Sequence, residues 1–115
     1  MPWTGNILEE TLVASAARSA DGSVTGGENY SDVDSLRVQL DVTAANGTGP
    51  SLAVFIEDSV DGANWDTIGS FAAKTAAGRE TITLSDFVGR RLRVRWAITG
   101  TTPSFTFSVK LAAEA

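Results

Sequence analysis

The sequence predicts an all-β protein, an antiparallel β-sandwich of Ig-like or jelly-roll-like form with about seven to eight strands and an extended N-terminal arm. Three observations lead to this fold class. Apolar and polar residues alternate along several segments after residue 35, β-branched and aromatic residues fill the apolar positions, and clusters of Gly and Pro separate the segments. A chain of 115 residues is enough for one domain with its own core.

Residues 1–34 differ from the rest of the chain, and we expect them to form the arm, with one strand over residues 10–18. Trp3, Ile7 and Leu8 are apolar residues outside the alternating pattern, and Gly26 and Gly27 would make a flexible joint. Two arrangements of the arm stay open. It folds back as a lid on the sandwich, or it reaches out and adds a strand to a neighbouring molecule.

Residues 35–115 are expected to form the sandwich domain. Alternation predicts half-buried strands over four segments, which are residues 36–43, 81–84, 91–98 and 105–111. Residues 52–56 are apolar at nearly every position, so we expect a strand that is covered on both faces.

Turn-forming residues separate these strands. Residues 46–50 and 100–103 combine Gly with Pro, and we expect each segment to end one strand and to start the next. Asp61 and Gly62 indicate a hairpin connection. The segment that begins at Leu36 is similar to the one that begins at Leu92, which we interpret as similar hairpins in corresponding places of two packed sheets.

Charge is unevenly distributed along the chain. Residues 1–66 contain 11 acidic and two basic residues, whereas residues 67–115 contain three acidic and seven basic ones, giving a net charge of −5. This acidic balance argues against nucleic acid and anionic membranes as partners. No apolar run approaches the roughly 20 residues of a membrane span, and residues 1–6 lack the features of a signal peptide.

The chain contains neither Cys nor His. This composition excludes disulfides, thiolate-bound metals and histidine acting as a general base or metal ligand. No pairing of a nucleophile with a base is visible in the sequence. We therefore predict a protein that is not an enzyme, with no catalytic residues, cofactor or metal site.

Residues 59–65 form the most motif-like segment. They resemble the Asp-box of sialidase-type propellers, shortened by one residue, and the hairpins of discoidin-like carbohydrate-binding sandwiches. We interpret the motif as a stabilised hairpin in which Asp61 caps the turn. Nearby oxygen ligands could instead bind Ca²⁺, but EF-hand spacing is missing and we expect a solvated acidic edge, formed by Glu57, Asp58, Asp61, Asn64 and Asp66.

Arg91, Arg93 and Arg95 are predicted to project from one face of a single strand. Three like charges at this spacing repel one another unless acidic groups lie opposite. Either they pair within the molecule, with Asp41 or Glu57, or they dock on the acidic surface of another subunit or copy. The candidate partner interface therefore comprises Trp3, Ile7, Leu8, Arg91, Arg93 and Arg95.

Residues 36–111 resemble small Cys-free β-sandwich proteins from the heads and tails of tailed bacteriophages. The resemblance is carried by three stretches, which read PSLAVFIEDSVDGANW, GRRLRVRW and TPSFTFSV. The chain looks most like a capsid decoration (head auxiliary) protein. It lacks the Pro-rich N-terminal half of the trimeric decoration type, so trimerisation is not implied.

This resemblance implies a virion structural protein that binds the outer surface of the assembled head and stabilises the shell by multivalent contacts. Its implied partners are the major capsid protein and other copies of itself, after synthesis in the host cytoplasm without a signal peptide. Two alternatives remain. One is a carbohydrate- or receptor-binding module on the virion that uses Trp65 or Trp96, and the other is a tail or connector component.

Overall fold

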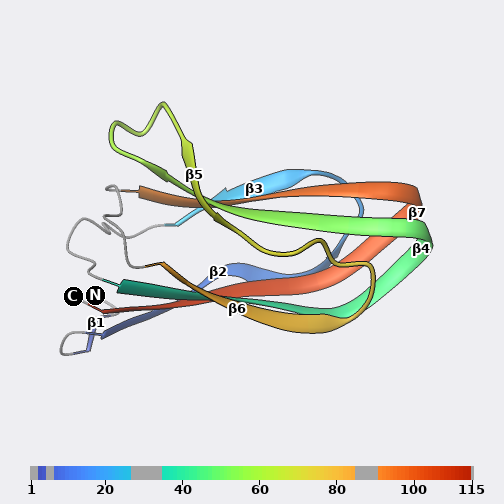
Figure 1. The fold of residues 1–115 in the computed structure, drawn as a ribbon, viewed down its shortest axis with the longest axis horizontal. Coiled ribbons are helices and arrows are strands. Elements are labelled where there is room, and N and C mark those ends of the chain that lie inside the picture. The colour runs from blue at the N-terminus through green and yellow to red at the C-terminus, as the bar shows by residue number, and fades with distance from the viewer. Residues whose placement is uncertain (1–2, 5–6, 27–34, 85–90, 115) are drawn as a thin grey trace.

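A computed structural model describes residues 3–4, 7–26, 35–84 and 91–114 of the chain. Its described residues form antiparallel strands in two packed layers, which confirms the predicted all-β sandwich (Figure 1). The strands are β1 (Trp3–Thr4), β2 (Ile7–Arg18), β3 (Gly22–Thr25), β4 (Ser35–Ser59), β5 (Asp66–Ser70), β6 (Gly78–Leu84) and β7 (Arg91–Glu114).

Strands β4 and β7 dominate the fold, with lengths of 25 and 24 residues. They pair antiparallel along their whole length, from Ser35 opposite Glu114 to Ser59 opposite Arg91. Both strands bend in the middle, so each contributes to both layers (Figure 1). Layer A contains β1, β2, β6, residues 35–45 and residues 105–114. Layer B contains β3, β5, residues 51–59 and residues 91–99.

The bend corrects one prediction. Residues 46–50 and 100–103 were expected to end strands, but they lie inside β4 and β7, where Thr48 still pairs with Thr101 between two register shifts. Their glycines do adopt the positive φ that the turn signal requires, at +114° for Gly47 and +127° for Gly100. The Gly and Pro clusters therefore bend continuous strands.

The two strands meet at the bend in an approximately two-fold arrangement. Gly47 of β4 lies against Pro103 of β7, and Gly100 of β7 lies against Pro50 of β4. A Cβ atom at either glycine would come within 2.9 Å of the opposing proline Cα. The similar segments that begin at Leu36 and Leu92 therefore belong to β4 and β7, two strands that pair with each other. As predicted, the two segments lie in different layers.

Every second side chain of β4 and β7 points into the space between the layers, as alternation predicted. Trp96 of layer B meets Phe107 of layer A edge to face, with ring centroids 5.5 Å apart. The segment 52–56 was expected to be covered on both faces, but only alternate residues are fully buried and those between them, Ala53 and Phe55, are half-buried. The largest fully buried side chains include Phe105, Phe107, Leu36, Leu40, Leu52, Ile56 and Leu92.

The described part of the predicted arm belongs to the sandwich. The expected strand exists and is longer than predicted, because β2 pairs with β7 from Ile7 opposite Glu114 to Arg18 opposite Phe105. A second strand, β3, pairs with the other half of β7. Leu12 and Val13 are buried in the core, which anchors β2 to the sheet. An extended arm is therefore wrong for residues 7–26. Gly27 lies outside the described residues.

Arg18 and Trp96 make contacts between the layers at the edge of the sandwich where the chain passes from β2 to β3. The Arg18 guanidinium donates hydrogen bonds to the carbonyls of Ala14, Ala16 and Phe107, at 2.9 to 3.2 Å. It also lies 5.2 Å from the centre of the Trp96 ring. The indole Nε1 of Trp96 donates to the carbonyl of Ala20 at 3.1 Å. These contacts connect both layers at one edge.

Gly100→Ala tests the bend. Alanine would be strained at a φ of +127°, and its Cβ would press on the backbone of Gly49 and Pro50, so we expect a loss of about 2 to 4 kcal/mol in unfolding free energy. Gly78→Ala is the matched control, because open space surrounds Gly78. Urea denaturation measures both. An equal effect of the two substitutions would contradict the proposed role of the bend.

Candidate functional site

The hairpin of residues 59–66 connects β4 to β5 and carries the motif identified in the sequence. Asp61 Oδ1 accepts hydrogen bonds from the backbone N–H groups of Ala63 and Asn64, both at 2.8 Å. Its Oδ2 accepts from Asn64 Nδ2 at 2.8 Å, while the N–H of Gly62 donates to Ser59 Oγ at 2.7 Å. The prediction that Asp61 caps the turn is confirmed. The hydrogen bonds from Asn64 and Ala63 hold the pKa of Asp61 well below its usual range.

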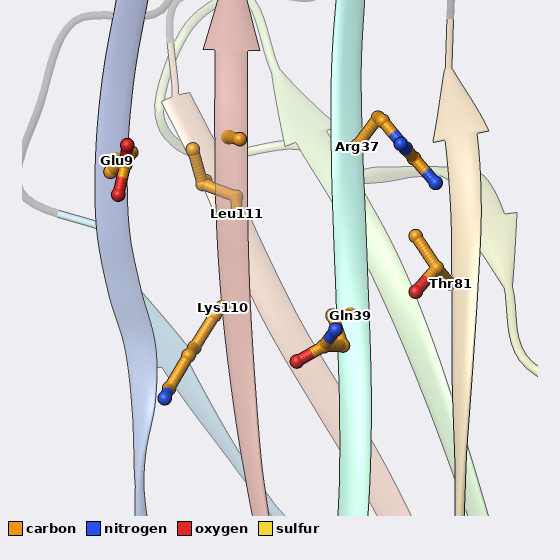
Figure 2. A pocket seen from close by; sticks show the side chains of 7 residues that line it. Glu9, Arg37, Gln39, Thr81, Lys110 and Leu111 are labelled. Carbon is orange, nitrogen blue, oxygen red and sulfur yellow. The ribbon is translucent and has the colours of Figure 1, made fainter.

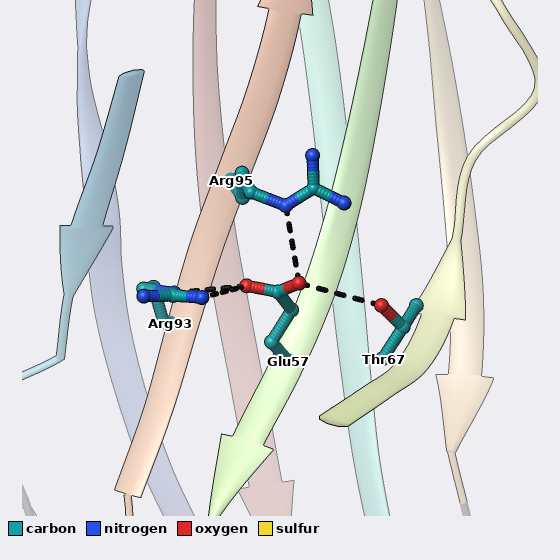
Figure 3. Close-up of polar contacts among 4 residues, drawn as sticks. All are labelled: Glu57, Thr67, Arg93 and Arg95. Carbon is teal, nitrogen blue, oxygen red and sulfur yellow. Dashed lines mark hydrogen bonds and ion pairs between the residues drawn. The ribbon is translucent and has the colours of Figure 1, made fainter. Parts of the chain in front are cut away.

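The predicted arginine face lies on the outer surface of layer B (Figure 3). Glu57 stands directly opposite Arg93 in the β4–β7 pairing. Its Oε1 accepts from Arg93 Nε at 2.8 Å and from Nη2 at 2.5 Å, and its Oε2 accepts from Arg95 Nε at 3.1 Å. Pairing within the molecule is thus confirmed for Glu57. Asp41 is not brought to these arginines, because it lies in layer A opposite Ser108.

Two aromatic rings contact the arginines that pair with Glu57. The guanidinium of Arg93 lies 4.4 Å from the centre of the Trp65 ring, and that of Arg95 lies 4.2 Å from the centre of the Phe55 ring. We call Phe55, Glu57, Trp65, Arg93 and Arg95 the Glu57 cluster. Since Trp65 belongs to the hairpin and Arg93 to β7, the cluster fastens the hairpin to layer B.

Glu57 is the buried centre of the cluster, with 5% of its surface exposed. Burial alone would raise the pKa of its carboxyl group, but hydrogen bonds and charges from Arg93 and Arg95 outweigh that effect and lower the pKa below its ordinary value. Thr67 Oγ1 of β5 donates a further hydrogen bond at 3.3 Å. The carboxylate therefore stays ionised and connects three strands, β4, β5 and β7.

Arg91, the third predicted arginine, is exposed and lies beside the hairpin. Its Nη1 occupies the position next to Gly62 where a Cβ atom would otherwise project, at 1.8 Å from that ideal Cβ. Gly62 has a φ of +81°, so the turn favours glycine for its backbone. Arg91 thus lies beside the turn, and Arg93 contacts Trp65 at its base.

The solvated edge that was predicted for this region forms only in part. Glu57 and Asp58 are buried, and only Asp61, Asn64 and Asp66 are exposed. Within residues 3–4, 7–26, 35–84 and 91–114, no group of three acidic side chains is arranged to hold a metal ion. The carboxylate of Glu57 instead accepts hydrogen bonds from Arg93 and Arg95, and that of Asp61 accepts them from the backbone of the turn.

Trp3, Ile7 and Leu8 are placed by the pairing of their backbones. Trp3 pairs with Leu8 in the β1–β2 ladder, and Ile7 and Leu8 pair with Glu114 and Ala113 of β7. The backbone therefore folds back onto its own sheet in layer A. The arginines belong to the other half of β7, in layer B, so the two predicted groups start from different layers.

A shallow hollow of about 320 Å³ crosses the outer face of layer A (Figure 2). Polar side chains line most of it, including Glu9, Arg37, Gln39, Thr81 and Lys110. They come from four neighbouring strands, β2, β7, β4 and β6. In the part of the chain that the structure describes, no helix has the length and apolarity needed to cross a membrane.

No family model matches the chain, and no curated protein matches it in sequence. Solved structures with the same fold do exist. XepA, described as an exported protein of PBSX, matches with a TM-score of 0.67 and 17% identity over 94% of this chain and 37% of XepA. A chain of infectious bursal disease virus, Gx strain, matches with a TM-score of 0.59 and 14% identity over 93% of this chain and 31% of the viral chain.

A third similar structure is the CBM36-1 domain of a multidomain xylanase from the hindgut metagenome of Trinervitermes trinervoides. Its TM-score is 0.52 at 9% identity, and the match covers 96% of this chain and 98% of that domain. At these identities the similarities show the fold alone. The chain spans only 37% of XepA and 31% of the viral chain. It shares a β-sandwich with viral and exported proteins, and its resemblance to decoration proteins stays a prediction.

Glu57→Gln tests the Glu57 cluster. The substitution leaves Arg93 and Arg95 side by side without a counter-charge, so we expect unfolding free energy at pH 7 to fall by about 2 to 4 kcal/mol. Glu9→Gln, which alters an exposed carboxylate on the outer face of layer A, is the control and should change stability by less than about 0.5 kcal/mol. Similar losses in both variants would contradict a special role for Glu57.

The stability of Glu57→Gln should also depend on pH differently from that of the wild type. Because the pKa of Glu57 is lower in the folded chain, its stabilisation is complete above the ordinary value of 4.5 and disappears as the pH falls through the lowered pKa. The stability difference between the wild type and Glu57→Gln should therefore shrink steadily below pH 4.5. Thermal unfolding from pH 7 to pH 2 measures it, and a constant difference would contradict the ion pairing.

Proposed function

We propose that this chain is a structural component of a virion, which binds the outer surface of the assembled capsid and stabilises the shell through many copies. The observation that carries the proposal is the shared fold with a chain of infectious bursal disease virus over 93% of the present chain. A chain of that virus in its T13 viral particle supports it with a TM-score of 0.56. In this role the chain is a structural protein of the particle and not an enzyme.

The form of the molecule suits such a role. Two long strands pass through both layers, and side chains such as Arg18 and Trp96 close one edge, so the body is rigid. A rigid body loses little conformational freedom when it docks. Many modest contacts on a fixed lattice then add up to stable attachment, which is the multivalent mechanism that we propose for the shell.

Two surfaces are our candidates for contact with the major capsid protein or with another copy. One is the β1–β2 edge of layer A, which carries Trp3, Ile7 and Leu8. The other is the outer face of layer B with its three arginines. The Arg93 and Arg95 side chains remain 25% and 42% exposed although both pair with Glu57, so they can still meet carboxylates of a partner.

The copy number of the chain in purified virions tests the proposed function. We expect hundreds of copies, because a decoration protein covers a lattice of many equivalent positions. Quantitative mass spectrometry against the major capsid protein provides the measurement. About six to twelve copies would indicate a ring-shaped connector or tail part instead. Absence of the chain from purified particles would overturn a virion role altogether.

A carbohydrate-binding module is the second candidate, favoured by the fold match to the CBM36-1 domain over nearly the full length of both chains. Trp96 cannot serve as a sugar platform, because it is buried with 6% exposure and contacts Phe107. Trp65 is half-buried, and Arg93 stacks on its ring. Quenching of tryptophan fluorescence by polysaccharides, lost in Trp65→Ala, would favour this candidate over a decoration protein.

A further inference from the structure

The described strands leave four edges at which a sheet ends. Layer A ends at β2, together with the short β1, and at β6, while layer B ends at β3 and at β5. A sheet edge exposes a row of backbone N–H and C=O groups that can pair with a strand of another molecule. Proteins usually protect their edges with short strands, bulges or covering side chains, and three of these four edges are protected in such ways.

The protection differs among the three edges. β3 has only four residues and β5 only five, and the pairing of β5 with β4 shifts in register between Ile56 and Glu57. The pairing of β2 with β7 contains two register shifts, and β1 covers the start of β2. Near the end of β2, Arg18 donates hydrogen bonds to the carbonyls of Ala14 and Ala16. A long and regular row of free backbone groups is therefore missing from the described parts of these edges.

The edge of β6 lacks these protections. Its seven residues pair with β4 without a register shift, from Gly78 opposite Val42 to Leu84 opposite Leu36. The strand contains neither Pro nor Lys, and residues 81–83 are all β-branched. Among the strands that the structure describes, only β4 pairs with it, and Figure 2 shows β6 as the outermost strand of layer A. This edge is therefore open to another strand.

The segment that precedes β6 does not occupy its open edge. Residues 71–74 instead form backbone hydrogen bonds with β4 in layer B. An inward-pointing charge can also protect an edge, and Glu80 faces inward beside Leu40. Its carboxylate, however, accepts hydrogen bonds from Lys74 Nζ and from the backbone N–H of Ala72. The charge of Glu80 is thus balanced within the molecule and does not keep a further strand away.

We propose that β6 pairs with β6 of a second copy of this chain, antiparallel and centred on Thr81, so that the two copies of layer A form one continuous sheet. In this register all seven residues of the strand pair. Thr81 faces the partner's Thr81, and Arg79 faces the partner's Thr83. Glu80 faces the partner's Ile82, so no like charges stand opposite each other. The two-fold contact uses the same surface on both copies and closes at a dimer.

Three features favour a second copy as the occupant. A copy brings the same alternation of polar outer and apolar inner residues, so both faces of the sheet continue across the contact. Ile82 and Leu84 are half-buried at the rim of the core, and a neighbouring β6 would cover them further. The outer face of layer A is also balanced in charge, so two such faces join without repulsion. Its charged residues within the described ranges are Glu9, Asp41, Glu114, Arg37, Arg79 and Lys110.

Sedimentation of the purified chain over a range of concentrations tests the pairing. The wild type should form a concentration-dependent dimer, and Thr81→Glu should weaken it about fivefold, because it places two carboxylates opposite each other. Thr11→Glu is the matched control, since it adds the same charge to the exposed outer face of β2, at the far edge of layer A. It should dimerise like the wild type. A wild type that stays monomeric at every concentration, or equal dimerisation by both variants, would overturn the proposal.

Single cysteines test the register, because the chain contains no Cys. Thr81→Cys places two thiols opposite each other, with Cα atoms about 4.5 to 5.5 Å apart, which a disulfide can bridge. In Thr83→Cys the two thiols lie four residues apart along the paired strands, roughly 13 Å, which a disulfide cannot bridge. We expect a disulfide-linked dimer from Thr81→Cys alone. Equal linking of both variants, or no linking of Thr81→Cys, would overturn the pairing centred on Thr81.

The dimer goes beyond the proposed function and does not depend on it. Thermal unfolding should show that Thr81→Glu and Thr11→Glu are folded equally well, because both side chains are exposed. A purified chain that fails to dimerise overturns the pairing of β6 and leaves the virion role intact, since the copy number in particles measures that role separately. A dimer of a chain that is absent from particles supports the pairing and overturns the virion role.

Discussion

The antiparallel pairing of β4 with β7 is the interaction on which every other strand depends. Strands β2 and β3 pair with the two halves of β7, and β6 and β5 pair with the two halves of β4. Because both long strands bend at Gly47 and Gly100, one continuous ladder supplies the centre of both layers. The layers are then joined by backbone as well as by the side chains between them, such as Trp96 and Phe107.

The same pairing builds the outer surface of layer B. Alternation sends Leu92, Val94 and Trp96 inward, so Arg91, Arg93 and Arg95 must point outward, where their cross-strand neighbours are Ser59, Glu57 and Phe55. The Glu57 cluster follows from this register, and it fastens Trp65 with the rest of the hairpin. A shift of one residue in the β4–β7 pairing would bury the arginines and release the hairpin. The core and the Glu57 cluster therefore share one determinant, the register of the β4–β7 pairing.

Alternation in the sequence was sufficient to predict the sandwich and the inward residues of β4 and β7, and the motif of residues 59–65 was sufficient to predict the capping role of Asp61. It was not sufficient at three places. The Gly and Pro of residues 46–50 signal positive φ, but a bend inside a strand and a turn between strands use the same signal. Ile7 and Leu8 are adjacent apolar residues outside the alternating pattern, which concealed that β2 begins at Ile7, before the predicted start at residue 10. The contact of Trp65 with Arg93 of β7 joins residues that are far apart in the sequence, so only the structure reveals it.

Native-state hydrogen exchange most directly tests the claim that β4 and β7 unite the two layers. β4 is paired on both sides in each layer, so its amides should exchange only by global unfolding. We predict equal exchange free energies for Val38 and Leu40 in layer A and for Val54 and Ile56 in layer B, all matching the value from denaturant unfolding. If the amides of one layer exchanged through an opening about 2 kcal/mol easier than those of the other, the layers would be separate units and the account would be contradicted.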